Sequence, residues 1–104
     1  MSMYAIRVVE LKNGAKTIEK KEELRARGFK YVAGLDGKCW AKRVETVEEA
    51  KEVIRDLNGL GFGTSFGTAY QGMFLRHREA QEKGIDLGDA PREIYFFQKE
   101  NNLL

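Results

Sequence analysis

The chain has 104 residues, of which 42% are hydrophobic and 33% are charged. This length suits one domain with a single core, and this composition excludes a disordered or fibrous protein. The longest unbroken apolar runs, such as Ile94–Phe97, have four residues and are far shorter than the roughly 20 residues of a membrane-spanning helix. With one cysteine and no recognisable signal peptide, the sequence predicts a cytoplasmic protein without membrane contact.

The net charge of +2 is unevenly distributed along the chain, and the N-terminal part is basic. Residues 1–43 contain 11 Lys and Arg against 5 Asp and Glu. Residues 44–61 contain 2 against 5, and residues 62–104 contain 5 against 6. A basic region of this kind suits a polyanionic partner, and a solvated lysine-rich surface has the same composition.

The first predicted elements are a strand and a short helix. Residues 3–11 are β-branched and apolar, as in a strand. After an Asn-Gly turn, good helix formers predict a helix over 19–27, capped by Thr17 and ended by Gly28. The same Asn-Gly pair also fits a hairpin with a return strand over 15–20.

Residues 29–44 form the clearest unit of the sequence. Two runs rich in aromatic and β-branched residues flank Asp36-Gly37, a pair favoured in tight hairpin turns. Thr46 then begins a capping box, and apolar residues at helical spacing predict a helix over 47–58.

A two-residue turn at Asp36-Gly37 fixes the register of this hairpin. It places Tyr31 opposite Lys42, with Trp40 on the same face, and Lys30 opposite Arg43 on the other face, where like charges repel. Large rings are normally buried, so we expect the aromatic face in the core. If that face is exposed, its two rings form a stacking platform for single-stranded bases.

The stretch Gly59–Thr68 contains four glycines but no nucleotide-binding motif. The glycines follow a predicted helix rather than a strand, and they fit neither the dinucleotide-binding pattern nor the P-loop. We therefore expect a loop over 59–67, anchored by Phe62 and Phe66. A second capping box and helical spacing predict a helix over 68–84.

The aromatic run in residues 92–98 predicts a final strand after a turn at 87–91. Asp89 and Pro91 also fit the start of a helix over the same residues. The strand interpretation completes a β-α-β-β-α order with an extra helix and a last strand.

This order predicts an α+β fold of the ferredoxin-like, split β-α-β kind, with an antiparallel sheet and helices on one face. We expect residues 1–104 to form a single domain with no linker. Its parts are a basic β-α-β-β-α unit (1–58), the glycine-rich loop (59–67), and a helix with a terminal strand (68–104).

No catalytic, metal or cofactor site is expected, and we do not expect an enzyme. A single His and a single Cys exclude zinc-binding patterns within the chain, and the acidic residues form no calcium loop. Cys39 is expected to act as a small hydrophobic residue, and His77 as a histidine at the edge of the core.

Part of the basic N-terminal region also resembles a known module. Thr17-Ile18, the run Glu23–Tyr31 and the run Lys38–Lys42 resemble a small module of plasmid and phage proteins, within residues 17–44 of this chain. In that module a short helix ends in Leu-Lys-x-x-Gly, followed by Phe-Arg-Trp, a turn and Lys-x-Trp-x-Lys. The resemblance implies a mobile element, a host-cell cytoplasm and proximity to nucleic acid, and it transfers no catalytic residue.

These observations predict a non-enzymatic accessory module of a mobile element that associates with nucleic acid. The residues expected to face the anionic partner are Arg7, Lys30, Lys42 and Arg43, with Tyr31 and Trp40 as the alternative stacking residues. The alternative function is a protein-binding inhibitor or adaptor, such as a phage anti-defence protein, whose partner is a host protein with an acidic surface.

Overall fold

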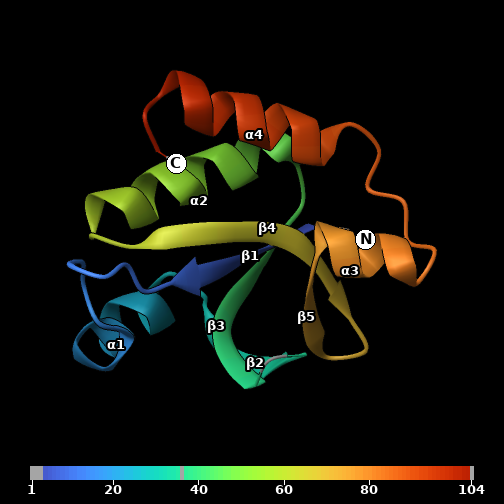
Figure 1. Ribbon diagram of the computed structural model, residues 1–104. Coiled ribbons are helices and arrows are strands. Elements are labelled where there is room, and N and C mark those ends of the chain that lie inside the picture. Colours follow the sequence, from blue (N-terminus) through green and yellow to red (C-terminus); the bar gives the residue numbers. More distant parts are fainter. Residues whose placement is uncertain (1–3, 36, 104) are drawn as a thin grey trace.

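The computed structural model describes residues 4–35 and 37–103. Within them the chain folds as a small α+β domain in which five strands form a barrel and four helices pack outside it (Figure 1). In chain order the elements are β1 (Tyr4–Val9), α1 (Thr17–Ala26), β2 (Lys30–Gly34), β3 (Gly37–Val44), α2 (Val47–Gly59), β4 (Gly63–Tyr70), β5 (Met73–Arg76), α3 (His77–Glu82) and α4 (Ala90–Glu100).

The sheet closes on itself in the order β1-β3-β2-β5-β4, with β4 pairing with β1. All neighbouring strands are antiparallel except β2 and β5, which are parallel. The α+β class is confirmed, but the predicted ferredoxin-like open sheet is wrong. The physical reason is that residues 63–76 form two further strands, and these supply the missing wall of a barrel.

The first strand and the two helices of the N-terminal part are confirmed. β1 occupies most of the predicted strand 3–11, of which residue 3 lies outside the described residues. α1 begins at Thr17, which is the first helical residue rather than the cap. The backbone N–H and the hydroxyl of Thr17 both donate to the Glu10 carboxylate. The alternative return strand over 15–20 is therefore wrong.

The predicted cap of α2 is also confirmed. The Thr46 hydroxyl accepts a hydrogen bond from the Glu49 backbone N–H at 3.1 Å. The Glu49 carboxylate accepts from the backbone N–H of Glu45, one residue before the cap, at 2.7 Å. The first hydrogen bond satisfies a donor that the first helical turn leaves open, and the second satisfies the backbone N–H just before the cap.

The hairpin of β2 and β3 exists, but its predicted register is wrong. Gly37 pairs with Gly34 and so belongs to β3, while Asp36 lies outside the described residues. Tyr31 consequently pairs with Trp40 instead of Lys42. This shift is by two residues along β3, so each side chain keeps its predicted face while its partner changes.

Lys30 and Arg43 are not directly opposite each other, which corrects the predicted repulsive pair. Lys30 pairs with Ala41, and Arg43 pairs with Ala5 of β1. The two cations are diagonal neighbours on one face of the β2–β3 hairpin, because Lys30 of β2 pairs with Ala41 and Arg43 is two residues beyond Ala41 on β3.

The predicted loop over 59–67 and the predicted helix over 68–84 are both wrong. β4 starts at Gly63, and a tight turn at Gln71-Gly72 joins it to β5. Both turn residues have positive φ angles, 49° and 78°, as a two-residue hairpin turn requires. Only the end of the predicted helix is helical, as α3.

The C-terminal segment is a helix, so the predicted strand over 92–98 is wrong and the competing interpretation is correct. Pro91 lies in the first turn of α4, where its missing N–H is not needed. Ile94 is buried in one cluster with side chains of α2 and of the strands, whereas Tyr95 and Phe96 are each about half exposed. An amphipathic helix thus explains the aromatic run without a strand.

Two groups of buried side chains lie on opposite faces of the barrel wall. The helix-side core lies between the barrel and helices α1, α2 and α4, and contains Ile6, Val8, Leu24, Phe29, Val44, Ala50, Ile54, Leu57, Phe62 and Ile94. The barrel interior contains Ala5, Cys39, Ala41 and Phe74. As expected, Phe62 is an anchor in the core and Cys39 is a small buried residue.

The expected burial of the whole aromatic face of the hairpin is wrong. Phe29 is buried and Trp40 packs partly against the helix-side core, but 58% of the Tyr31 surface is exposed. Figure 1 shows why: α2 and α4 cover the β1 and β4 side of the barrel, while β2 lies on the far side from them.

Candidate nucleic-acid interface

The outer face of β2 and β3 carries a pair of aromatic rings, which we call the ring pair. Tyr31 and Trp40 are opposite each other in the hairpin, with ring centroids 5.3 Å apart and planes tilted by 43°. The Arg25 guanidinium lies 5.6 Å from the Trp40 ring centroid, and the Lys38 ammonium lies 5.9 Å from that of Tyr31. Arg25 also forms an ion pair with Glu22 at 2.8 Å, so the ring pair combines exposed π surface with one compensated cation and with Lys38.

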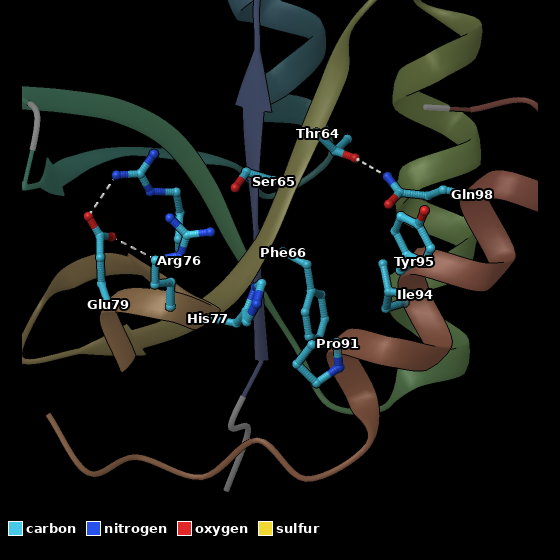
Figure 2. A pocket seen from close by; sticks show the side chains of 11 residues that line it. Thr64, Ser65, Phe66, Arg76, His77, Glu79, Pro91, Ile94, Tyr95 and Gln98 are labelled. Carbon is cyan, nitrogen blue, oxygen red and sulfur yellow. Dashed lines mark hydrogen bonds and ion pairs between the residues drawn. The ribbon is translucent and has the colours of Figure 1, made fainter. Parts of the chain in front are cut away.

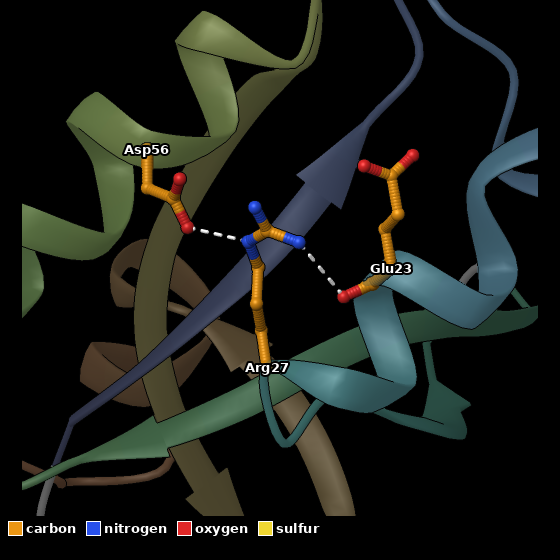
Figure 3. A network of polar contacts seen from close by, with 3 residues as sticks. All are labelled: Glu23, Arg27 and Asp56. Carbon is orange, nitrogen blue, oxygen red and sulfur yellow. Dashed lines mark hydrogen bonds and ion pairs between the residues drawn. The ribbon is translucent and has the colours of Figure 1, made fainter.

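A polar contact between the end of α1 and α2, which we call the clamp, lies two residues from Arg25. Arg27, near the end of α1, donates from Nε to the Asp56 carboxylate of α2 at 2.6 Å and from a terminal nitrogen to the Glu23 carbonyl at 3.1 Å (Figure 3). The hydrogen bond to Asp56 raises the pKa of the Arg27 guanidinium. The C-terminal turn of α1 is thereby held against α2.

Beside the ring pair the barrel opens into a cavity of about 510 Å³, which we call the barrel mouth. All five strands contribute to it, together with the turns at Gly28 and Gly72. Its lining residues are Ala5, Gly28, Lys30, Val32, Ala41, Lys42, Arg43, Ala69, Gly72, Met73 and Phe74.

The rim of the barrel mouth brings together three of the four predicted anion-facing residues. Lys30 and Arg43 lie on the inner face of the wall: Lys30 pairs with Ala41 across the hairpin, and Arg43 is two residues beyond Ala41 on β3. Lys42 alternates to the outer face, where its Cε lies 3.7 Å from the position that a Cβ on Gly28 would occupy. None of the three forms an ion pair within residues 4–35 and 37–103.

The electrostatics of the barrel mouth favour an anion. No carboxylate of the described residues lines it, and its floor is formed by apolar side chains, of which Ala5 and Phe74 are almost fully buried. Uncompensated cations over a low-dielectric floor attract anions more strongly than the same charges on an open surface. The cations can therefore bind a phosphate or carboxylate while the apolar side chains contact an apolar group attached to it.

The fourth predicted residue, Arg7, lies elsewhere in the barrel. It is two residues beyond Ala5 on the inward face of β1, between Ala41 and Ser65 of the neighbouring strands, and it does not line the barrel mouth. Its buried Nε has no hydrogen-bond partner in the described part of the chain. Burial raises the pKa of the Cys39 thiol, and the Arg7 charge acts on it in the opposite direction.

A second cleft of about 450 Å³ lies on another side of the molecule, between β4, the start of α3 and α4 (Figure 2). Arg76 is already compensated there, because its guanidinium and its backbone N–H both bind the Glu79 carboxylate at 2.9 Å. These hydrogen bonds lower the pKa of Glu79 below its usual range. The mixed charge makes this cleft a poorer site for a polyanion than the barrel mouth.

His77 lines this second cleft and is exposed, so its expected place at the edge of the core is wrong. The reason is that the helix begins at His77 itself and leaves its side chain outside the packed face. Figure 2 shows the imidazole beside Phe66 and Pro91.

The two cations over the ring pair were not predicted from the sequence. The sequence predicts Arg25 in a helix and Lys38 in a strand, and both lie in the stretches that resemble the plasmid and phage module, but neither is expected to face the partner. The spacing between α1 and the hairpin gives no local signal that Arg25 reaches Trp40. Lys38, in contrast, is two residues before Trp40 on the same face, so the strand alternation alone could have identified it.

No group of three His, Cys, Asp or Glu side chains in the described residues is arranged to hold a metal ion. Among the helices formed by residues 4–35 and 37–103, none is sufficiently long and apolar to cross a bilayer. No protein-family model, curated protein or solved structure matches this chain.

Proposed function

We propose that this protein is a non-enzymatic module that associates with single-stranded nucleic acid through the ring pair and the barrel mouth. The observation that carries the proposal is the exposed Tyr31 ring against Trp40, flanked by Arg25 and Lys38 and adjoining the three cations of the barrel mouth. The resemblance to a plasmid and phage module supports an accessory role in a mobile element.

The chemistry of the ring pair favours unpaired bases. A base stacked on an aromatic side chain contributes about 1–3 kcal/mol, and every base offers a suitable π face. Bases inside a duplex are stacked on one another and cannot reach Tyr31 in the same way. A single strand therefore fits this surface better than a double strand.

The cations supply the second part of the interaction. Within the described ranges of the chain, Lys30, Lys42 and Arg43 have no carboxylate partner to compete with an incoming phosphate. Contacts of this kind release counterions, so affinity falls with salt by about 0.7 log units per log unit of salt for each phosphate on a single strand.

The direct test is the salt dependence of binding to a fluorescein-labelled dT10 oligonucleotide, followed by anisotropy. We expect wild-type affinity to fall steeply with salt, and Lys30→Ala with Arg43→Ala to weaken binding and flatten the slope by about 1.4. The matched control is Arg92→Ala with Lys99→Ala, which removes the same charge from α4, away from the barrel mouth. Equal slopes for the two double variants would overturn the proposed interface.

A second candidate function rests on a different surface. Tyr95 and Phe96 of α4 are each 48% exposed and contact each other edge to face at 5.6 Å. Exposed aromatic pairs are common at protein interfaces, which supports an inhibitor or adaptor with a host-protein partner. Two results together would favour this function: the wild type does not bind dT10, and the double variant Tyr95→Ala with Phe96→Ala loses a complex that the wild type forms with a defined host protein.

A further inference from the structure

The barrel mouth differs from an ordinary basic surface patch because its cations surround a cavity. Its floor is made of side chains from the barrel interior, and its rim carries three cations. A phosphate alone would use the rim and leave the floor empty. The volume of about 510 Å³ lies within the range of about 300–1,000 Å³ found for small-molecule sites.

We propose that the barrel mouth admits one unstacked nucleotide of the bound strand, with its base on the apolar floor and its phosphate at the rim. This inference rests on the proposed function and names the part of the ligand that the cavity takes. It divides the interface into an outer stacking surface and an inner nucleotide pocket.

The small side chains of the barrel wall make room for a base. Ala5, Ala41 and Ala69 present only methyl groups, where larger residues would fill the opening. Val32, Met73 and Phe74 provide further apolar contacts around them. Met73, which is half-buried, offers a polarisable thioether suited to a flat π system, whereas Phe74 is almost fully buried and exposes little of its ring.

The polar groups of the pocket match the other half of a nucleotide. Among the described residues, the polar side chains that line it are Lys30, Lys42 and Arg43, and all of them are donors. They can bind phosphate oxygens. When these donors bind the phosphate, no polar side chain of the described lining residues remains for the base, and we expect little discrimination among sequences.

Lys42 connects the two parts of the interface. It shares the outer face of β3 with Trp40, two residues away, and it also lines the barrel mouth. A strand stacked on the ring pair thus reaches the pocket within the span of one lysine side chain. One phosphate on Lys42 can lie between a base on Trp40 or Tyr31 and a base in the pocket.

Methyl NMR tests this directly, because five pocket residues carry methyl groups: Ala5, Val32, Ala41, Ala69 and Met73. The full chain, at 11.9 kDa, is titrated with dT10 and with an abasic ten-residue strand of the same charge. We expect nuclear Overhauser effects between these methyl groups and thymine protons with dT10. With the abasic strand we expect changes only at rim backbone amides.

Two variants separate the pocket from the ring pair. Ala69→Leu, which fills the pocket, should weaken dT10 binding about fivefold or more. Tyr31→Ala should weaken binding to a similar degree but retain the methyl contacts. If Ala69→Leu does not fold, the wild-type contacts decide alone.

The outcomes distinguish this inference from the function on which it rests. Binding of dT10 without contacts to the pocket methyl groups would overturn the inference and leave the proposed function standing. The same methyl shifts with the abasic strand would also overturn it. Absence of any dT10 binding would overturn both.

Discussion

The two buried regions of this molecule, on either side of one barrel wall, are built from different residues. On β1, Ile6 points to the helix-side core and the preceding Ala5 points to the barrel interior. The helix-side core is filled with large aliphatic and aromatic side chains, whereas the interior contains mainly alanine and cysteine. The contrast indicates that the helix side supplies most of the stability, while the small side chains of the interior leave the cavity of the barrel mouth open.

The largest expected effect tests the helix side of this comparison. Phe62 is fully buried between α2 and β4, so Phe62→Ala should lower the free energy of unfolding by about 3–5 kcal/mol. Cys39→Ala in the barrel interior removes a single sulfur atom and should lower it by only about 1 kcal/mol. Urea denaturation measures both. Equal losses would contradict the division between the two regions.

A glycine in the barrel wall tests how tightly that wall is closed. A Cβ on Gly67 would collide with the Leu75 carbonyl oxygen of the adjacent strand, so Gly67→Ala should destabilise the fold by about 3 kcal/mol. Gly59→Ala is the matched control, since a Cβ there meets nothing and alanine is the better helix residue. Thermal unfolding should show a lower Tm for the first variant and an equal or higher Tm for the second.

If Gly67→Ala were as stable as the wild type, β4 and β5 would not approach each other as closely as in this fold. The barrel closure would then need revision.

The next prediction concerns the Glu79 carboxylate, which binds Arg76 where β5 leads into α3. Hydrogen bonds from Arg76 lower the pKa of Glu79 in the folded state. The ionised Glu79 carboxylate therefore stabilises the fold above a pH of about 4.5, and this stabilisation is lost as the pH falls through the lowered pKa. Glu79→Gln should reduce stability by about 1 kcal/mol at pH 7, and the difference from wild type should shrink in acid. Urea denaturation from pH 7 to pH 3 measures this.

The exposed Glu82 of the same helix provides the control for Glu79. Glu82→Gln should leave the free energy of unfolding nearly unchanged at pH 7. A constant difference between Glu79→Gln and wild type across the whole pH range would show that the carboxylate charge is not what stabilises the junction of β5 and α3.

The smallest expected effect concerns the clamp on the helix-side surface. The Arg27 and Asp56 side chains are partly exposed, so their coupling should be about 0.5 kcal/mol and should fall at high salt. A double-mutant cycle with Arg27→Met and Asp56→Asn isolates it. A coupling above about 2 kcal/mol would mean that surface contacts rival the buried core in this protein.

The parts of the fold that were predicted correctly depend on local signals. α2 has its cap at Thr46 and a regular apolar stripe, and both are visible within a short stretch of sequence. α1 was found from its helix formers and Gly28. The hairpin of β2 and β3 was found from its turn, although one misplaced glycine, Gly37, led to the wrong partners.

Barrel closure could not be predicted in this way, because it depends on distant pairing. Residues 5–9 of β1 pair with residues 63–67 of β4, and no local sequence pattern predicts that these two segments pair. Ala69, Tyr70 and Phe74 fit helical spacing as well as the strands they form. Gln71-Gly72 is a weak turn signal, because tight hairpin turns favour Asn, Asp or Gly before the glycine and glutamine rarely adopts the φ angle of 49° that Gln71 has here.

The candidate site was only partly predictable for the same reason. Alternation along strands correctly placed Lys30 with Arg43, and Tyr31 with Trp40, on common faces. The depth of the barrel mouth comes from β4 and β5, neither of which was predicted from the sequence. The position of Arg7 within the barrel likewise follows from closure.

The most direct measurement is the emission of Trp40, the sole tryptophan of the chain, during titration with dT10. Stacking of a base on the ring pair should quench this emission to saturation, with a midpoint that moves to higher oligonucleotide concentration as salt increases. Tyr31→Leu should weaken the effect, and Arg92→Ala with Lys99→Ala should not. Unchanged emission while labelled dT10 is fully bound would contradict the account, because the strand would then lie away from β2 and β3.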